Sequence, residues 1–203
     1  MYGNIEEGVG RRDMYWNYQP SVPWVPTREE VIKALLSLLS IPSGYTVYDI
    51  GCGDGRVAIA LAEEFPGIRV KCVEARKDLV DKARKAIEEK GLMDRVEVIE
   101  GDFFKISLSD ADLIYMYLLT SVNQKLRPKL EEELRQGTII VSLDFPIPGW
   151  NPVAVVELPR SWQRAFYIYA KGLSDGSVSL ESREKILENV LHVVRIKKHE
   201  LRL

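Results

Sequence analysis

The segment Tyr48–Arg56, which reads Tyr-Asp-Ile-Gly-Cys-Gly-Asp-Gly-Arg, constrains the fold of this chain more than any other. It includes the end of a β-branched run, residues 46–50, that is typical of a strand, and a helix-like segment begins at Arg56. Glycines alternate between them at positions 51, 53 and 55. Because glycine has no Cβ, such a turn can adopt positive φ angles and let its backbone approach a ligand. The segment predicts a strand, a ligand-binding turn and a helix.

The glycine spacing argues against two other nucleotide-binding turns. A dinucleotide turn, Gly-x-Gly-x-x-Gly, would place its third glycine at position 56, where Arg56 stands. A phosphate loop requires Gly-Lys-Ser/Thr after the turn, and this chain has Gly-Arg-Val. The acid-x-Gly-x-Gly-x-Gly pattern instead resembles motif I of the seven-strand methyltransferases that depend on S-adenosylmethionine (SAM). The resemblance implies a Rossmann-like, three-layer α/β/α fold with a mostly parallel sheet, SAM as cofactor and methyl transfer as the reaction.

Strand and helix patterns alternate after residue 45, which independently favours a parallel sheet with helices on both faces. We expect a first helix after Thr27, a plausible N-cap with Glu30 in a capping box, that ends before Pro42 and buries Val31, Leu35, Leu38 and Leu39. Strands are predicted at 46–50, 68–74, 95–100, 113–117, 138–143, 153–158 and 165–170, and further helices at 56–65, 77–90 and 121–135.

Three regions are expected along the chain. Residues 1–26 carry Gly, Pro and aromatic residues without periodicity and are interpreted as an extended N-terminal arm. Residues 27–171 are predicted to form the methyltransferase domain, and residues 172–203 a C-terminal extension. Within the extension, the run 190–196 fits a helix or a strand equally well.

Composition narrows the class of protein. A formal net charge of -2 over 203 residues argues against a broad basic surface for nucleic acid. The two cysteines, Cys52 and Cys72, have no Cys-x-x-Cys or His neighbour, so we predict no metal site and no disulfide, with Cys52 a small residue in a tight turn. No apolar run reaches the length of a membrane span, so a soluble cytoplasmic protein is expected. Few Asn and Gln beside many Glu, Lys and Arg hint at a thermophilic source.

Acids follow three successive predicted strands. In an open α/β sheet, ligands bind beyond the carboxyl ends of the strands, which is where Asp49, Glu74 and Asp102 stand. With SAM, the turn containing Gly51, Gly53 and Gly55 lets backbone groups reach the methionine part. Asp49 can hold the ammonium directly or through water, and Glu74 can accept from the ribose hydroxyls. Asp102 can accept from the adenine amino group, with Phe103 or a neighbour packed on the ring.

Each acid alone could be a solvated loop residue or a helix cap, and it is the set that favours a cofactor site. An NAD enzyme would also place an acid after the second strand. Its glycine spacing is absent, however, and no downstream His or Lys is poised for hydride transfer, so we set that alternative aside.

The acceptor side should follow the fourth strand, at residues 115–123. The Asn/Asp-Pro-Pro-aromatic motif of methyltransferases that act on base amino groups is absent there, and so is the cysteine that a cytosine C5 methyltransferase needs. Tyr117 is expected to form a wall of the acceptor channel, with Phe145 and Trp150 as further candidates. Tyr117 could equally pack in the core, and Trp150 could anchor its own turn.

Five segments carry a narrower resemblance. They are Val-Pro-Thr-x-x-x-Val (25–31), the glycine segment (48–56), Gly-Asp-Phe-Phe (101–104), residues 117–134 and Ser-Leu-Asp-Phe-Pro-Ile-Pro-Gly-Trp-Asn-Pro (142–152). Together they resemble the small protein-lysine methyltransferases of archaea and their mitochondrial relatives, which modify an ATP synthase subunit. These are distantly similar to the non-SET histone lysine methyltransferase. The resemblance covers about residues 20–171.

This resemblance implies transfer of methyl from SAM to lysine side chains of a protein, with no membrane and no direct nucleic-acid substrate. It implies that the segment 24–27 lies over the cofactor and that Thr27 bonds the SAM carboxylate end. The chain departs from its relatives at Leu143, where many have histidine. An RNA or small-molecule methyltransferase and a non-enzymatic SAM-binding protein remain alternatives. The target, the number of methyl groups, any general base and the oligomeric state stay open.

Overall fold

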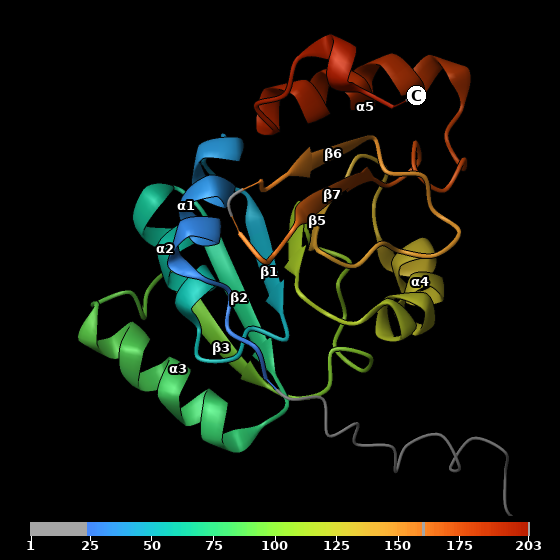
Figure 1. The fold of residues 1–203 in the computed structure, drawn as a ribbon. Coiled ribbons are helices and arrows are strands. Elements are labelled where there is room, and N and C mark those ends of the chain that lie inside the picture. Colours follow the sequence, from blue (N-terminus) through green and yellow to red (C-terminus); the bar gives the residue numbers. More distant parts are fainter. Residues whose placement is uncertain (1–23, 160, 203) are drawn as a thin grey trace, which may run out of the picture.

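A computed structural model describes residues 24–159 and 161–202. At its centre lies a seven-stranded sheet in the order β3-β2-β1-β4-β5-β7-β6, shown in Figure 1. Strands β1 to β5 run parallel, and β7 is antiparallel to both β5 and β6. The strands are β1 (Thr46–Ile50), β2 (Arg69–Glu74), β3 (Val96–Glu100), β4 (Leu113–Met116), β5 (Ile139–Leu143), β6 (Ala154–Glu157) and β7 (Ala165–Ala170).

Helices cover both faces of this sheet. They are α1 (Glu29–Leu38), α2 (Arg56–Glu64), α3 (Lys77–Glu89), α4 (Thr120–Glu133) and α5 (Leu180–Val193). In Figure 1, α1, α2 and α3 lie on one side of the sheet and α4 on the other, while α5 crosses near β6 at the top of the view. The Rossmann-like α/β fold with a mostly parallel sheet that is expected from the sequence is thereby confirmed.

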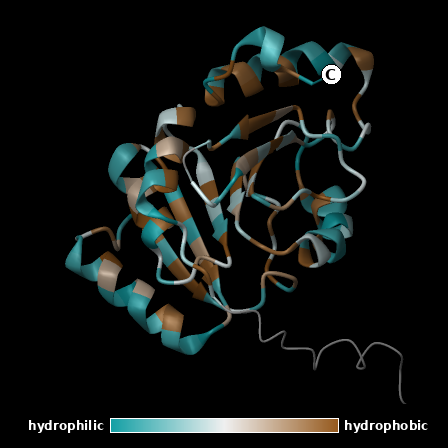
Figure 2. Cartoon of the chain, viewed as in Figure 1, coloured by the Kyte–Doolittle hydropathy of each residue, from teal (hydrophilic) through white to brown (hydrophobic). Residues whose placement is uncertain are grey.

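Side-chain alternation along the strands builds two hydrophobic clusters. In β1, Val47 joins the cluster that includes α1 and α2, and Tyr48 joins the cluster that includes Leu126 and Leu130 of α4. This is the period of two that a strand covered on both faces requires. Figure 2 shows the result as apolar strands between helices whose outer surfaces are hydrophilic.

The element boundaries agree with the predicted ones to within two residues at each end for the strands and for α2, α3 and α4. The prediction of a capping box formed by Thr27 and Glu30 was wrong. The helix α1 has Arg28 as its N-cap, without a side-chain cap bond. The Thr27 hydroxyl instead lies 3.0 Å from the Tyr115 hydroxyl, because it faces the sheet rather than the helix end. The predicted apolar face of α1 is confirmed, since Val31, Leu35, Leu38 and Leu39 are all buried.

The C-terminal residues after 172 pack on the same core. Ile186, Val190 and Val193 of α5 and the following Val194 are buried in the cluster that contains α1. The backbone then pairs briefly with the end of α1 through a bridge between Leu39 and Val194. The undecided run 190–196 is thus helical to Val193 and extended after it.

The predicted arm, residues 1–26, lies mostly outside the described residues. Within residues 24–159 and 161–202, no helix is both long enough and apolar enough to cross a membrane. The same residues hold no group of three or more side chains able to bind a metal ion.

Candidate cofactor and acceptor site

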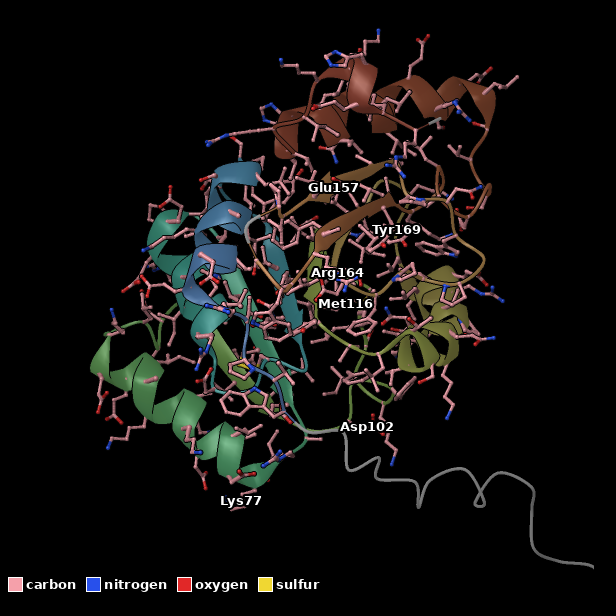
Figure 3. All side chains as sticks on the ribbon, in the orientation of Figure 1. Lys77, Asp102, Met116, Glu157, Arg164 and Tyr169 are labelled. Carbon is pink, nitrogen blue, oxygen red and sulfur yellow. A yellow bond between two sulfur atoms is a disulfide. The ribbon has the colours of Figure 1, made fainter. Side chains whose placement is uncertain are left out.

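The three acids predicted from the sequence meet at one edge of the sheet. Asp49 pairs in register with Cys72 of β2 and Tyr115 of β4, Glu74 ends β2, and Asp102 follows β3. Figure 3 marks Asp102 at the lower end of the sheet, at the opposite end of the molecule from α5. The site therefore lies beyond the carboxyl ends of the parallel strands, as such folds require.

The glycine turn needs its glycines for both conformation and space. Gly53 has φ +59° and Gly55, the N-cap of α2, has φ +79°, in the left-handed region that side chains disfavour. A Cβ on Gly53 would lie 2.2 Å from the Trp24 indole nitrogen. The backbone of the turn is thus the surface that a ligand, or the segment above it, can approach.

Glu74 holds this turn against β2. Its Oε2 accepts a hydrogen bond from the Gly53 amide at 2.9 Å, and Oε1 accepts from the Ala75 and Arg76 amides at 2.9 Å each. The side chain is buried. Glu74 therefore fixes the glycine turn as well as presenting a carboxylate beside it, a structural role that the sequence analysis did not foresee.

Asp49 is a buried carboxyl group with an unsatisfied oxygen. Its Oδ2 has no hydrogen-bond partner in the described part of the chain. Burial raises the pKa of Asp49 from 3.8 to about 8, a hydrogen bond from the Ala58 amide opposes this, and the charge of Glu74 adds to it. A buried carboxylate without a partner is costly, so the site favours either a proton or a cation there.

We expect SAM binding to release about one proton near pH 7, because an ammonium beside Asp49 would return its pKa below neutral. Isothermal titration calorimetry in two buffers of different ionisation enthalpy measures this number. The Asp49→Asn variant should release no proton; an equal release from that variant would exclude Asp49 as the source.

The same group affects stability in the free protein. Its pKa is raised on folding, so Asp49 makes folding less favourable as the pH rises from about 4 to about 8.

Asp102 and Phe103 occupy the next position along the edge. Asp102 Oδ1 accepts from the Phe104 amide at 3.0 Å, and both Asp102 and Phe103 are half-buried. The Phe103 and Phe104 rings lie 4.8 Å apart with a tilt of 37°. This places a carboxyl group beside aromatic faces, a combination that can accept from an amino group and pack a planar ring.

The two cysteines form a disulfide, which corrects the expectation of free thiols. The turn at residues 51–52 continues to donate to the Val73 carbonyl of β2, which brings Cys52 beside Cys72, with a Cα–Cα distance of 5.4 Å. No short-range cysteine motif announces this contact, because the pair is 20 residues apart and meets only through strand pairing. The disulfide anchors the glycine turn to β2 next to Glu74.

Reduction of this disulfide should lower stability. Closing a loop of this size stabilises a chain by about 3 kcal/mol in the chain-entropy description, which corresponds to roughly 6–12 °C in Tm for a protein of this length. Thermal melts with and without dithiothreitol measure the shift, and the Cys52→Ala/Cys72→Ala double variant, which has no disulfide to lose, should show none. Recovery of two alkylated thiols from the unreduced, denatured protein would contradict the disulfide.

The segment before α1 covers the glycine turn. Arg56 makes an ion pair with Asp54, lies 5.7 Å from the Trp24 ring centroid and donates to the Thr27 carbonyl. Thr27 itself is buried, with its hydroxyl bonded to Tyr115. Trp24 thus lies against the glycine turn, while the expectations that residues 24–27 cover the cofactor and that Thr27 bonds its carboxylate end stay predictions.

Two of the three predicted acceptor-side aromatics come together. Tyr117 follows β4 directly, and its ring stacks on Phe145 at a centroid distance of 6.0 Å and an angle of 25°. Trp150 is not part of this pair. Its indole is buried against Tyr169, and its Nε1 donates to Glu131 at 3.0 Å, which fits an anchor between α4 and the sheet.

Polar residues that the sequence analysis missed hold this pair in place. Asn123 Nδ2 donates to the Phe145 carbonyl at 2.9 Å, and the Ser142 hydroxyl donates to the same oxygen at 2.6 Å. Gln163, from the loop between β6 and β7, is fully buried, and its Oε1 accepts from the Arg28 amide. Only Ser142 had a signal in the sequence, as a polar residue in an apolar strand, whereas Asn123 and Gln163 lie in polar segments that do not set them apart.

Three comparisons place the chain among known proteins. The model of the ANTKMT methyltransferase domain matches residues 49–154. A protein-lysine N-methyltransferase of Saccharolobus islandicus is 39% identical over 77% of this chain and 98% of its own length. The adenine nucleotide translocase lysine N-methyltransferase of Mus musculus is 38% identical over 74% of this chain, which spans 65% of the mouse protein.

A solved structure gives the same fold. An RNA methyltransferase from Salinibacter ruber, in complex with S-adenosyl-L-homocysteine, is 40% identical with a TM-score of 0.67, over 72% of this chain and 93% of that one. The residues described above fit such a cofactor, because Asp49 offers a buried oxygen without a partner beside a turn whose glycines carry no side chains.

Proposed function

The chain belongs to the ANTKMT methyltransferase domain family, and from this premise we propose that it transfers a methyl group from SAM to lysine side chains of proteins. The observation that carries the proposal is the 39% identity to a protein-lysine N-methyltransferase over 98% of that relative's length. The similarity therefore extends over almost the whole of that relative and is not confined to the cofactor turn.

The residues at the cofactor edge have separate tasks. SAM, when bound, supplies a methyl group on a positively charged sulfur. We assign the backbone at Gly51, Gly53 and Gly55 to its methionine part and the free oxygen of Asp49 to its ammonium. Glu74 would accept from the ribose hydroxyls, and Asp102 with Phe103 would hold the adenine.

The acceptor side favours an amine that has lost its proton. A lysine nitrogen needs its lone pair to attack, so the neutral form is the reactive one. The stacked rings of Tyr117 and Phe145 exclude water on one side, which lowers the pKa of an ammonium beside them. Alignment of amine and methyl is then the main contribution of the protein, since the leaving group is already activated.

A second candidate is methylation of RNA, which the 40% identical Salinibacter ruber structure favours. The two candidates share the cofactor edge and differ in the acceptor. The residues after β4 argue against RNA. They lack the Asn/Asp-Pro-Pro-aromatic motif of methyltransferases that act on base amino groups. Against it also stands the formal net charge of -2, since RNA binding rests largely on basic surface.

Tritium-labelled SAM separates the two candidates. The enzyme is incubated with host cell lysate, and the product is divided and treated with protease or with nuclease. We expect the label to become acid-soluble with protease and to survive nuclease, with methylated lysine found by mass spectrometry. Label that survives protease and is released by nuclease would favour RNA instead. Glu74→Ala enzyme serves as the control for methylation by lysate enzymes.

A cytoplasmic location and protein partners are part of the same proposal.

A further inference from the structure

Asp144 stands out on the acceptor side by its backbone. Among the described residues it is the only one other than glycine with a positive φ, +61°. Such a conformation is uncommon for a residue with a side chain, and it persists where surrounding contacts impose it. Here its amide donates to the Ala165 carbonyl at 2.8 Å, which ties the end of β5 to the start of β7.

The two carboxylate oxygens of Asp144 have different partners. Oδ1 accepts from the Arg164 amide at 2.5 Å and from the Ala165 amide at 3.2 Å. The structure gives Oδ2 no backbone donor among the described residues. The carboxylate also accepts a hydrogen bond from the Tyr117 hydroxyl. Burial chiefly raises the pKa of Tyr117, a hydrogen bond with Gln163 opposes the rise, and the charge and hydrogen bond of Asp144 add to it.

Asp144 takes part in none of the ion pairs among the described residues. The side chain is half-buried, and beside it Gln163 Nε2 is buried without a partner of normal geometry. A half-buried carboxylate next to a stacked aromatic pair, with no partner charge, is a site suited to an incoming cation.

We propose that Asp144 binds the nitrogen of the target lysine, with Tyr117 and Phe145 as the walls around it. This inference rests on the proposed function and adds the residue that recognises the amine. The positions of Tyr117 and Asp144 after neighbouring strands support this proposal. Met116 and Ser142 are paired in the parallel ladder of β4 and β5, so Tyr117 and Asp144 leave the sheet at the same edge. Tyr117 follows the strand next to that of Asp49, and Asp144 follows the strand after it.

The chemistry gives Asp144 a task in the transfer as well as in binding. The Asp144 carboxylate holds the lysine ammonium as it enters and raises its pKa, which opposes the effect of the two rings, and the ammonium then loses one proton to water. Its nitrogen lone pair then attacks the methyl carbon, so that an N–C bond forms while the C–S bond breaks and its electron pair stays on sulfur. The positive charge moves from sulfur to nitrogen. A fixed carboxylate beside the nitrogen stabilises this charge as it develops, which is the main way in which preorganised groups accelerate such steps.

Asp144→Asn is the sharpest test, because asparagine can keep an oxygen toward the Arg164 and Ala165 amides while it removes the charge. The matched control is Asp112→Asn, another half-buried aspartate that accepts from a backbone amide, that of Thr46, at the opposite edge of the sheet. The acceptor is a peptide around a lysine that the wild type labels in the lysate experiment, made with lysine or with norleucine at that position.

Two measurements are compared. Binding of each peptide to protein saturated with S-adenosyl-L-homocysteine should favour lysine over norleucine by roughly 10- to 100-fold in the wild type and in Asp112→Asn, and by little in Asp144→Asn. The value of kcat/KM for the lysine peptide should fall about 100-fold in Asp144→Asn, with unchanged affinity for SAM. Tyr117→Phe, which keeps the ring, should retain the preference for lysine.

The outcomes separate this inference from the function on which it rests. If Asp144→Asn keeps the wild-type preference for lysine and its kcat/KM, the assignment of Asp144 is wrong while lysine methylation stands. If wild-type enzyme labels no protein lysine, the proposed function fails and this inference with it. A variant that loses SAM affinity and Tm together with activity would show that Asp144 only supports the fold, which also overturns the assignment.

Discussion

Deletion of residues 180–203 is expected to leave a chain that does not fold. Ile186, Val190, Val193 and Val194 are buried, and removal of α5 would take them from the core and expose the apolar residues beneath. Burial of each such side chain is worth about 1.5–3 kcal/mol, so their loss amounts to roughly 6–12 kcal/mol. That is comparable with the whole stability of a typical domain, about 5–15 kcal/mol. Circular dichroism and gel filtration of the truncated protein measure the outcome.

Single substitutions on α5 provide a graded version of this experiment. Val190→Ala, at a fully buried position, should destabilise the protein by about 1–3 kcal/mol in urea unfolding, because it removes buried methyl groups and leaves a cavity. Leu180→Ala, on the same helix but 87% exposed, should change little. A truncated protein with native circular dichroism and an unchanged Tm would show that the helix is an accessory to the fold.

The sheet could be predicted from the sequence because its signals are local. Each strand is a short run, either largely apolar or, as in β2 and β3, with apolar and charged residues interspersed, and each of α2, α3 and α4 shows one apolar face. The C-terminal helix was left undecided because Val190–Ile196 contains apolar residues on several sides. Its helical form comes from contacts with distant segments, such as the bond from the Ser40 amide to the Val193 carbonyl. Contacts of this range leave no local pattern.

The candidate site divides in the same way. Asp49, Glu74 and Asp102 were predictable, because the carboxyl ends of parallel strands meet at one edge. Contacts between residues that only the folded chain brings together could not be predicted. The disulfide of Cys52 and Cys72 depends on the path of the turn, and the left-handed backbone of Asp144 depends on two amides some 20 residues away. Thr27 had a local capping signal, but its tertiary bond to Tyr115 prevailed.

Substitution of Glu74 should reduce SAM affinity more than any other single change at the cofactor edge. In Glu74→Ala, the amides of Gly53, Ala75 and Arg76 lose their acceptor. The Gly53 amide is buried, so leaving it unsatisfied costs about 1–3 kcal/mol, whereas water can reach the amides of the exposed Ala75 and Arg76. The glycine turn would loosen, and the two hydroxyl contacts proposed for the ribose would vanish. We expect SAM affinity to fall at least about 100-fold in isothermal titration calorimetry, since hydrogen bonds to a charged group are worth about 1.5–3 kcal/mol each.

The loss of affinity in Glu74→Ala could come from the loosened turn rather than from lost contacts to the ribose. A double-mutant cycle that changes the ligand as well as the protein separates the two causes. The affinities of S-adenosyl-L-homocysteine and of its 2′-deoxy analogue are compared in the wild type and in Glu74→Gln. The control is Glu100→Gln, because Glu100 is paired with Glu74 in the β2–β3 ladder. If Glu74 binds the hydroxyls, wild type and Glu100→Gln should prefer the natural ligand by roughly tenfold and Glu74→Gln by much less, because the interaction energy belongs to the pair. An equal preference in all three proteins would leave Glu74 as the anchor of the turn and assign the ribose to another residue.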